Sequence, residues 1–169
     1  MTNLAIILIL IISTITDLRS RKILNIVTMP AIILALIFHL ITTGLDGFLF
    51  SGQGFLVGIG LLFIPCMMGG IGAGDVKLLA AVGAWKGTLF VLYTGIYAGI
   101  FGGLIALFIL IKRKKLVFTV KNMLFSLLFL KSTKGSLEIS NDTQNNVSIP
   151  YAIPIALGAL MTFIMESYL

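Results

Sequence analysis

Long apolar runs, separated by short polar stretches, make up most of the chain. This pattern predicts six helices, at about residues 4–18, 24–43, 54–70, 75–85, 88–111 and 149–168. Several of these runs are long enough, or nearly so, to cross a hydrocarbon core about 30 Å thick, whereas the stretch 75–85 is too short to cross alone. We therefore expect an all-α membrane protein, a bundle of about six transmembrane helices that forms a single domain over residues 1–169.

The composition favours a membrane protein over a soluble one. Hydrophobic residues make up 59% of the chain and charged residues only 11%, a balance outside the range of ordinary soluble domains. The first apolar run has no basic residue before it and no small-residue cleavage site after it, so we expect a retained helix rather than a signal peptide. The single cysteine, Cys66, lies inside an apolar run and indicates neither a disulfide nor a zinc site.

The basic residues predict the orientation of the helices. If the loop after the first helix is cytoplasmic, alternation puts eleven of the twelve Lys and Arg residues inside and leaves only Lys86 outside. Both termini then lie outside. The net charge of +6 is explained by this asymmetry, with the basic run at 112–115 as an anchor on anionic lipid, so no nucleic-acid partner is expected.

The segment 116–130 is apolar but short, and it lies between basic flanks. Thr119, Asn122 and Ser126 form a narrow polar stripe along it at helical spacing. We interpret this segment as a helix at the cytoplasmic interface rather than as a seventh span. Residues 131–148 are interpreted as a polar cytoplasmic loop before the last helix.

The predicted topology separates the six acidic residues into two groups. Four of them fall in loops or near the outer end of the last helix: Asp46, Glu138, Asp142 and Glu166. The other two, Asp17 and Asp75, fall at the inner ends of their helices, on the same membrane face and at similar depth. Because ionisable side chains at membrane depth are rare and expensive, these two are the candidates for function.

Two neighbouring carboxyl groups share a proton, so one of them accepts a proton from water while the other donates to the carbonyl oxygen under attack. Such a pair hydrolyses an amide bond without a metal ion, a serine or a cysteine. The chain offers no zinc ligand set, and its one histidine, His39, is assigned a structural role in the second predicted helix.

Glycines precede Asp75 in the stretch "GGIGAGD" of residues 69–75. One interpretation is that they let the backbone turn and approach another segment closely, with Asp75 ionised at a helix N-terminus. The other is that they only permit tight helix packing, with Asp75 as a cap. The residues themselves leave both interpretations open.

Three elements of the chain resemble the type IV prepilin peptidases, a family of intramembrane aspartyl proteases. "GAGDVKLLAAVG" (72–83) resembles the family's GxGD signature, including the lysine two positions on, Lys77. "DLRSRKILN" (17–25) resembles the element that follows the first helix, with Leu24 where proline is usual. "IPYAIPIALG" (149–158) resembles the Pro-aromatic segment that opens the last helix.

The resemblance implies that Asp17 and Asp75 are the catalytic pair, supported by the backbone at Gly72 and Gly74. The single cysteine and the short stretch between Asp17 and Asn25 resemble the protease-only members, which implies no zinc, no methyl donor and no other cofactor. The implied partner is a prepilin-like precursor with a basic leader, a glycine and then a hydrophobic helix. It would be cut at the cytoplasmic face of a prokaryotic plasma membrane.

Three further polar residues near the inner face, Asn25, Lys77 and Tyr151, are candidates to line the substrate site, although ordinary interhelical hydrogen bonding explains them as well. Lys77 is two positions past Asp75 on a helix, so it points away from that carboxyl and is expected to reach the inner surface, substrate or lipid. The alternative function is a small membrane carrier that binds a cation or proton at Asp17 and Asp75. A carrier places its acids near the membrane midplane, whereas these two fall at one face.

Overall fold

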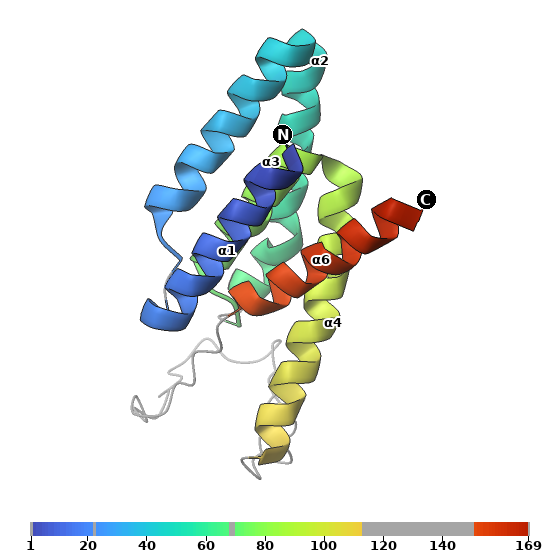
Figure 1. Ribbon diagram of the computed structural model, residues 1–169. Coiled ribbons are helices and arrows are strands. Elements are labelled where there is room, and N and C mark those ends of the chain that lie inside the picture. The colour runs from blue at the N-terminus through green and yellow to red at the C-terminus, as the bar shows by residue number, and fades with distance from the viewer. Residues whose placement is uncertain (1, 22, 68–69, 113–150, 169) are drawn as a thin grey trace, which may run out of the picture. The chain divides into compact units, whose positions relative to one another are not determined.

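The computed structural model describes residues 2–21, 23–67, 70–112 and 151–168, in which all regular secondary structure is helical. Its helices are α1 (Thr2–Ser20), α2 (Asn25–Met67), α3 (Ala73–Lys86), α4 (Thr88–Lys112) and α6 (Ala152–Tyr168) (Figure 1). Residues 1–102 and 150–169 form one compact unit, and residues 103–149 form a second. The candidate site lies entirely within the first unit. The interfacial helix and polar loop predicted at 116–148 lie outside the described residues.

α2 is two helical arms that meet at Gly44. Gly44 has φ 68° and ψ −144°, a backbone conformation that favours glycine, and the chain reverses direction there (Figure 1). The helices predicted at 24–43 and 54–70 correspond to these arms. The loop expected between them was wrong, because residues 45–53 are helical and Asp46 lies within α2. One glycine with positive φ is enough to reverse the chain, so no longer loop is needed.

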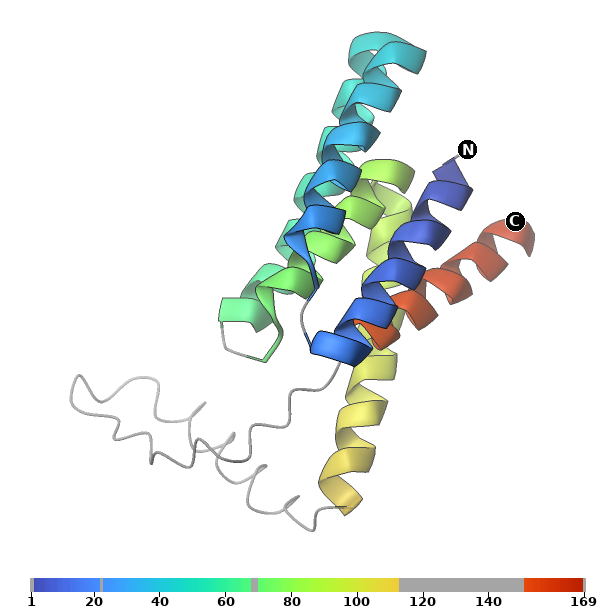
Figure 2. The ribbon, with the colours of Figure 1, turned by 60° about the vertical axis from the view of Figure 1, so that its left-hand side comes forward.

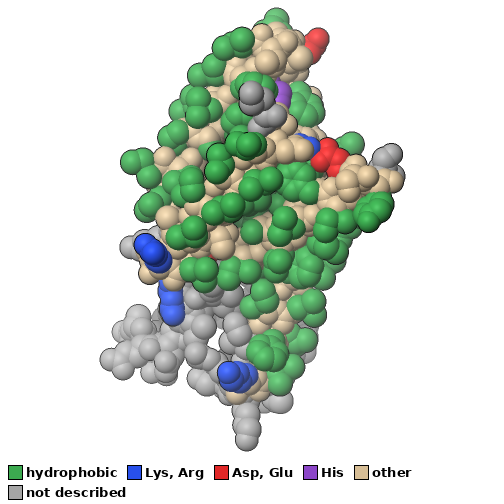
Figure 3. Space-filling model, viewed as in Figure 1, with side chains coloured by type: hydrophobic (Ala, Val, Ile, Leu, Met, Phe, Trp, Pro, Cys, Tyr) green, Lys and Arg blue, Asp and Glu red, His purple; other side chains and the backbone are tan. Residues whose placement is uncertain are grey.

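In the part of the chain that the structure describes, three helical segments are long and apolar enough to cross a membrane: Thr2–Ser20, Asn25–Met67 and Thr88–Phe108. Hydrophobic side chains cover most of the face of the first unit seen in Figure 3. A surface of this kind suits contact with lipid rather than water. The expectation of an all-α membrane protein is therefore confirmed, while the count of six spans stays a prediction.

α3 is the most deeply buried helix of the first unit and packs against both arms of α2. Figure 2 shows it running alongside them. The Trp85 indole N–H donates a hydrogen bond to the Ala31 carbonyl of the first arm at 3.0 Å. The Ser51 hydroxyl of the second arm donates to the Ala84 carbonyl at 2.7 Å. Both bonds lie near the C-terminal end of α3, so the two arms of α2 hold that end of the helix between them.

α6 packs against α1, α3 and the first part of α4. Thr94 on α4 donates a hydrogen bond to the Thr162 hydroxyl on α6 at 3.3 Å, in a buried position. Gly158 permits the close approach of these helices, since a Cβ built there would lie 2.6 Å from the Thr94 carbonyl oxygen. The beginning of α6 is thereby brought beside the end of α1.

Candidate active site

Asp75 lies in the first turn of α3, where only one of its two carboxylate oxygens accepts a hydrogen bond within the described residues. Gly72 is the N-cap of the helix, and its backbone N–H donates a hydrogen bond to Asp75 Oδ2 at 3.2 Å. The other oxygen, Oδ1, is buried and has no hydrogen-bond partner within the described residues. Buried polar atoms are almost always paired, so an unpaired carboxylate oxygen is an unusual feature.

The two glycines of the "GAGD" stretch serve close approach rather than an unusual backbone conformation. Gly72 has φ −75° and ψ 147°, which any residue can adopt. A Cβ at Gly72 would lie 3.1 Å from Asp75 Oδ2, and a Cβ at Gly74 would lie 3.0 Å from the Ile23 Cβ. The close approach expected in the first interpretation and the tight helix packing expected in the second are therefore both present. Gly72 leaves room beside the carboxylate, and Gly74 lets α3 begin against the segment that follows α1.

Asp17 lies on the buried face of α1, near the end of that helix. Its side chain is 6% exposed, and its Oδ2 accepts a hydrogen bond from the Ala152 backbone N–H at 3.1 Å. Ala152 is the first residue of α6, and the N–H groups at a helix N-terminus are free to bind an acceptor. The N-terminus of α6 thus orients and stabilises the Asp17 carboxylate.

The structure brings Asp17, Asp75 and Tyr151 into one neighbourhood. The negative charge of Asp17 is close enough to act on the ionisation of Asp75, which is only 8% exposed. The Tyr151 phenol lies within electrostatic reach of Asp75, and because a phenol is protonated at neutral pH it is able to donate a hydrogen bond. The Tyr151 ring also packs against Gly102, where a Cβ would lie 2.9 Å from its Cε2 atom.

Asn25 and Lys77 form a separate pair at the edge of this neighbourhood. Lys77 Nζ donates a hydrogen bond to Asn25 Oδ1 at 2.9 Å, in an exposed position. Lys77 thus bonds to the start of α2 rather than to Asp75. The bond links the beginning of α2 to the second turn of α3. This is the interhelical role that the sequence left open for both residues, and their contact with substrate stays a prediction.

The sequence profile of the type IV leader peptidase family matches residues 4–107 of the chain, which is more than half of it. The chain belongs to the type IV leader peptidase family. Comparison with curated proteins and with solved structures gave no significant match. The family assignment makes the chain a peptidase, and its apolar helices make it a membrane protein. The matched region contains Asp17, Gly72, Gly74 and Asp75, whereas α6 lies beyond it.

Within the part of this peptidase that the structure describes, no group of three or more His, Cys, Asp and Glu side chains converges on one point. The structural role assigned to His39 stays a prediction, and the contacts of its ring are those of a packed side chain. Its Nδ1 lies 2.8 Å from the Ala35 carbonyl oxygen, and its ring contacts those of Phe38, Phe50 and Trp85. These contacts belong to the packing of α2 and α3 rather than to the neighbourhood of the two aspartates.

Sequence reasoning missed two features of the peptidase. One is the Ala152 N–H, because a backbone donor carries no side-chain signal, although the segment 149–158 was singled out. The other is the ion pair between Lys86 and Glu166, whose carboxylate oxygens lie 2.7 and 2.6 Å from Lys86 Nζ. The predicted topology did place both of these residues on the outer side, and that shared location was the available signal.

Proposed function

We propose that the chain is an intramembrane aspartyl endopeptidase in which Asp17 and Asp75 activate a water molecule. The observation that carries this proposal is the pairing itself. Two carboxyl groups from helices far apart in the sequence are both buried, lie within electrostatic reach of each other, and are each held through one oxygen by a backbone N–H. Two such groups in a medium of low dielectric share one proton, which is the state that general acid–base hydrolysis needs.

The reaction follows from this state. The ionised carboxylate takes a proton from water as the water oxygen attacks the scissile carbonyl carbon, and the protonated carboxyl donates its proton to the carbonyl oxygen. The tetrahedral intermediate then collapses and the carbon–nitrogen bond breaks. The carboxyl that took its proton from water gives that proton to the leaving amine, and the other carboxylate takes its proton back from the hydroxyl of the intermediate as the carbonyl re-forms. The Oδ1 atom of Asp75 has no partner within the described residues, so its lone pairs are available for a hydrogen bond to the water. The protonated Tyr151 phenol supplies a further donor in the same neighbourhood.

We further propose that the substrate is a prepilin-like precursor, cut between a basic leader that ends in glycine and a hydrophobic helix. The family supports this substrate class. The predicted orientation, with six spans, both termini outside and the basic residues inside, would keep a basic leader at the cytoplasmic face. Asp17, near the inner end of α1, and Asp75, at the inner start of α3, would then lie at the membrane boundary. The scissile peptide bond of the precursor would be presented at the same place. Membership of a peptidase family favours this function over the carrier.

The test is cleavage of a synthetic precursor by the purified protein in detergent. Asp17→Asn and Asp75→Asn should each abolish cleavage, because asparagine keeps the size of the side chain but cannot cycle a proton. The matched control is Asp46→Asn, which changes an exposed acid of α2 that the structure places in no site. Full processing by either active-site variant, with a normal folded yield, would refute the aspartyl dyad.

A further inference from the structure

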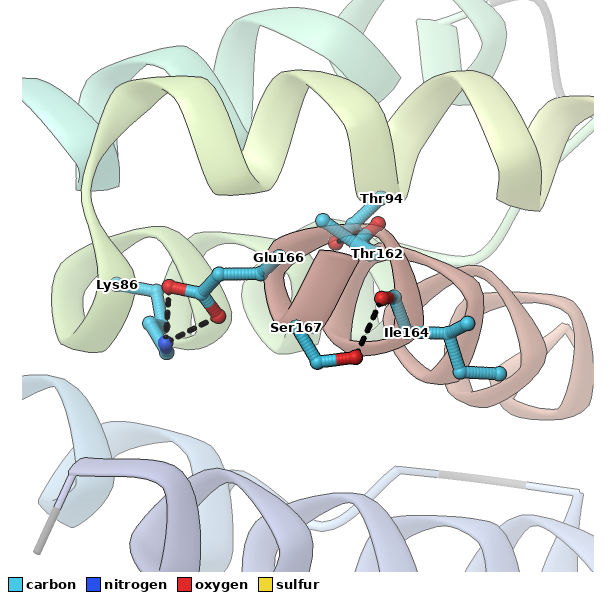
Figure 4. A network of polar contacts seen from close by, with 6 residues as sticks. All are labelled: Lys86, Thr94, Thr162, Ile164, Glu166 and Ser167. Carbon is cyan, nitrogen blue, oxygen red and sulfur yellow. Dashed lines mark hydrogen bonds and ion pairs between the residues drawn. The ribbon is translucent and has the colours of Figure 1, made fainter. Parts of the chain in front are cut away.

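α6 is bonded to the first unit at both of its ends. At its start, the Ala152 N–H donates to Asp17 Oδ2 at 3.1 Å. At its end, Glu166 accepts hydrogen bonds from Lys86 Nζ through both carboxylate oxygens (Figure 4). Lys86 is the last residue of α3, the helix whose first turn carries Asp75. The two helices that hold the aspartates in place are therefore joined to each other at their far ends.

The environment of Lys86 makes this ion pair stronger than an ordinary surface pair. The Lys86 side chain is only 13% exposed, and Glu166 is 51% exposed. Lys86 Nζ also lies 5.1 Å from the centre of the Phe90 ring and 5.2 Å from that of Phe163. Partial burial reduces screening by water and salt, and the two ring faces attract the ammonium and restrict its movement. The positive charge of Lys86 is also favourable at the C-terminus of α3, where the helix dipole is negative.

The ion pair is too far from the aspartates to take part in the chemistry directly. Glu166 comes fourteen residues after Ala152 on α6, about 21 Å along a helix, and Lys86 comes eleven residues after Asp75 on α3, about 17 Å. Figure 4 also shows Thr94 beside Thr162, a contact that joins α6 to α4 rather than to α3. Within the described residues, the Lys86–Glu166 pair is thus the side-chain bond that joins α6 directly to α3.

We propose that Lys86 and Glu166 are positioning residues for the active site, which by joining the far ends of α3 and α6 hold the Ala152 N–H against Asp17. The kinetic consequence of this inference rests on the proposed function, while its structural consequence does not. Without the ion pair, α6 retains its contacts with α4 but its angle to α3 is less restricted. The hydrogen bond at its other end then opens more often, and Asp17 loses its fixed orientation towards Asp75.

The kinetic test is a double-mutant cycle with Glu166→Gln, Lys86→Met and the double variant. Each single variant should lower kcat at saturating precursor about tenfold with little change in KM, and the double variant should lose no more than either single one. Ser167→Ala is the control, because Ser167 donates only to the Ile164 carbonyl within the same helix end, at 2.7 Å (Figure 4). Full kcat in Glu166→Gln, or losses that multiply in the double variant, would overturn the inference.

The structural test does not depend on cleavage. Only two Tyr–Ala sequences occur in the chain, at 97–98 and 151–152, so labelling tyrosine with ¹³C and alanine with ¹⁵N isolates the amide signals of Ala98 and Ala152. Hydrogen exchange at Ala152 should be about tenfold faster in Glu166→Gln, with Ala98 unchanged as the internal reference. Unchanged exchange at Ala152 overturns the inference whatever the protein cleaves. Faster exchange in a protein that cleaves no precursor supports the inference and refutes the proposed function instead.

Discussion

Gly58→Ala tests whether the position of α3, and with it Asp75, depends on contact between helix backbones. Gly58 lies on the second arm of α2, where a new Cβ would come within 2.7 Å of both the Leu79 carbonyl oxygen and the Ala80 Cα. These are backbone atoms of two fully buried residues, which cannot move aside as the end of a side chain can. The arm and α3 must therefore separate, and overpacking of this kind destabilises a protein by about 1–3 kcal/mol.

Gly60→Ala is the matched control, because Gly60 lies on the same arm with nothing within 4 Å of the added Cβ. Replacing glycine by alanine inside a helix stabilises it by about 0.5–1 kcal/mol, and this gain is common to both variants. The difference between the two variants therefore isolates the contact with α3, at about 1–3 kcal/mol. For a chain of this size each kcal/mol lowers the melting temperature by about 2–4 °C.

The assay is thermal unfolding of both purified variants in the same detergent, together with kcat for the precursor. Gly58→Ala should melt several degrees below Gly60→Ala and should have a lower kcat, because the first turn of α3 moves with the rest of the helix. Equal melting temperatures would refute the claim that the close approach of Gly58 to Leu79 and Ala80 fixes α3. A lower melting temperature with unchanged kcat would show that the packing supports the fold without positioning Asp75.

Two further predictions concern the chemistry and the core. Cleavage should follow a bell-shaped pH profile and should continue in excess EDTA: it falls at low pH as both carboxyl groups become protonated and at high pH as both become ionised, and a loss in EDTA that added metal restores would contradict the metal-free dyad. Trp85→Phe removes the 3.0 Å bond from the indole N–H to the Ala31 carbonyl, which keeps its partner within the helix, so the variant should lower the free energy of unfolding by about 0.5–1.5 kcal/mol; a variant as stable as the wild type would show that this bond contributes nothing.

The sequence by itself determined that lipid surrounds this protein, and it determined where most of the helices lie along the chain. Hydrophobicity is a property of each residue, and a long apolar run needs lipid wherever the rest of the chain lies. The same local information located Asp17 and Asp75, because an acid at membrane depth stands out against its neighbours. The short stretch at 75–85 was also recognisable as unable to cross a bilayer alone, and it proved to be the helix that the others enclose.

Only the tertiary structure decided how these helices meet. The hydrogen bond from Ala152 to Asp17 joins residues 135 positions apart, and the ion pair from Lys86 to Glu166 joins residues 80 apart. Neither leaves a trace in local periodicity, because a backbone N–H is the same in every residue and an ion pair depends on where two distant side chains arrive. The reversal at Gly44 likewise depended on φ, which hydrophobicity does not encode. The pattern of the chain specifies which residues avoid water, while packing between the helices specifies which of them touch.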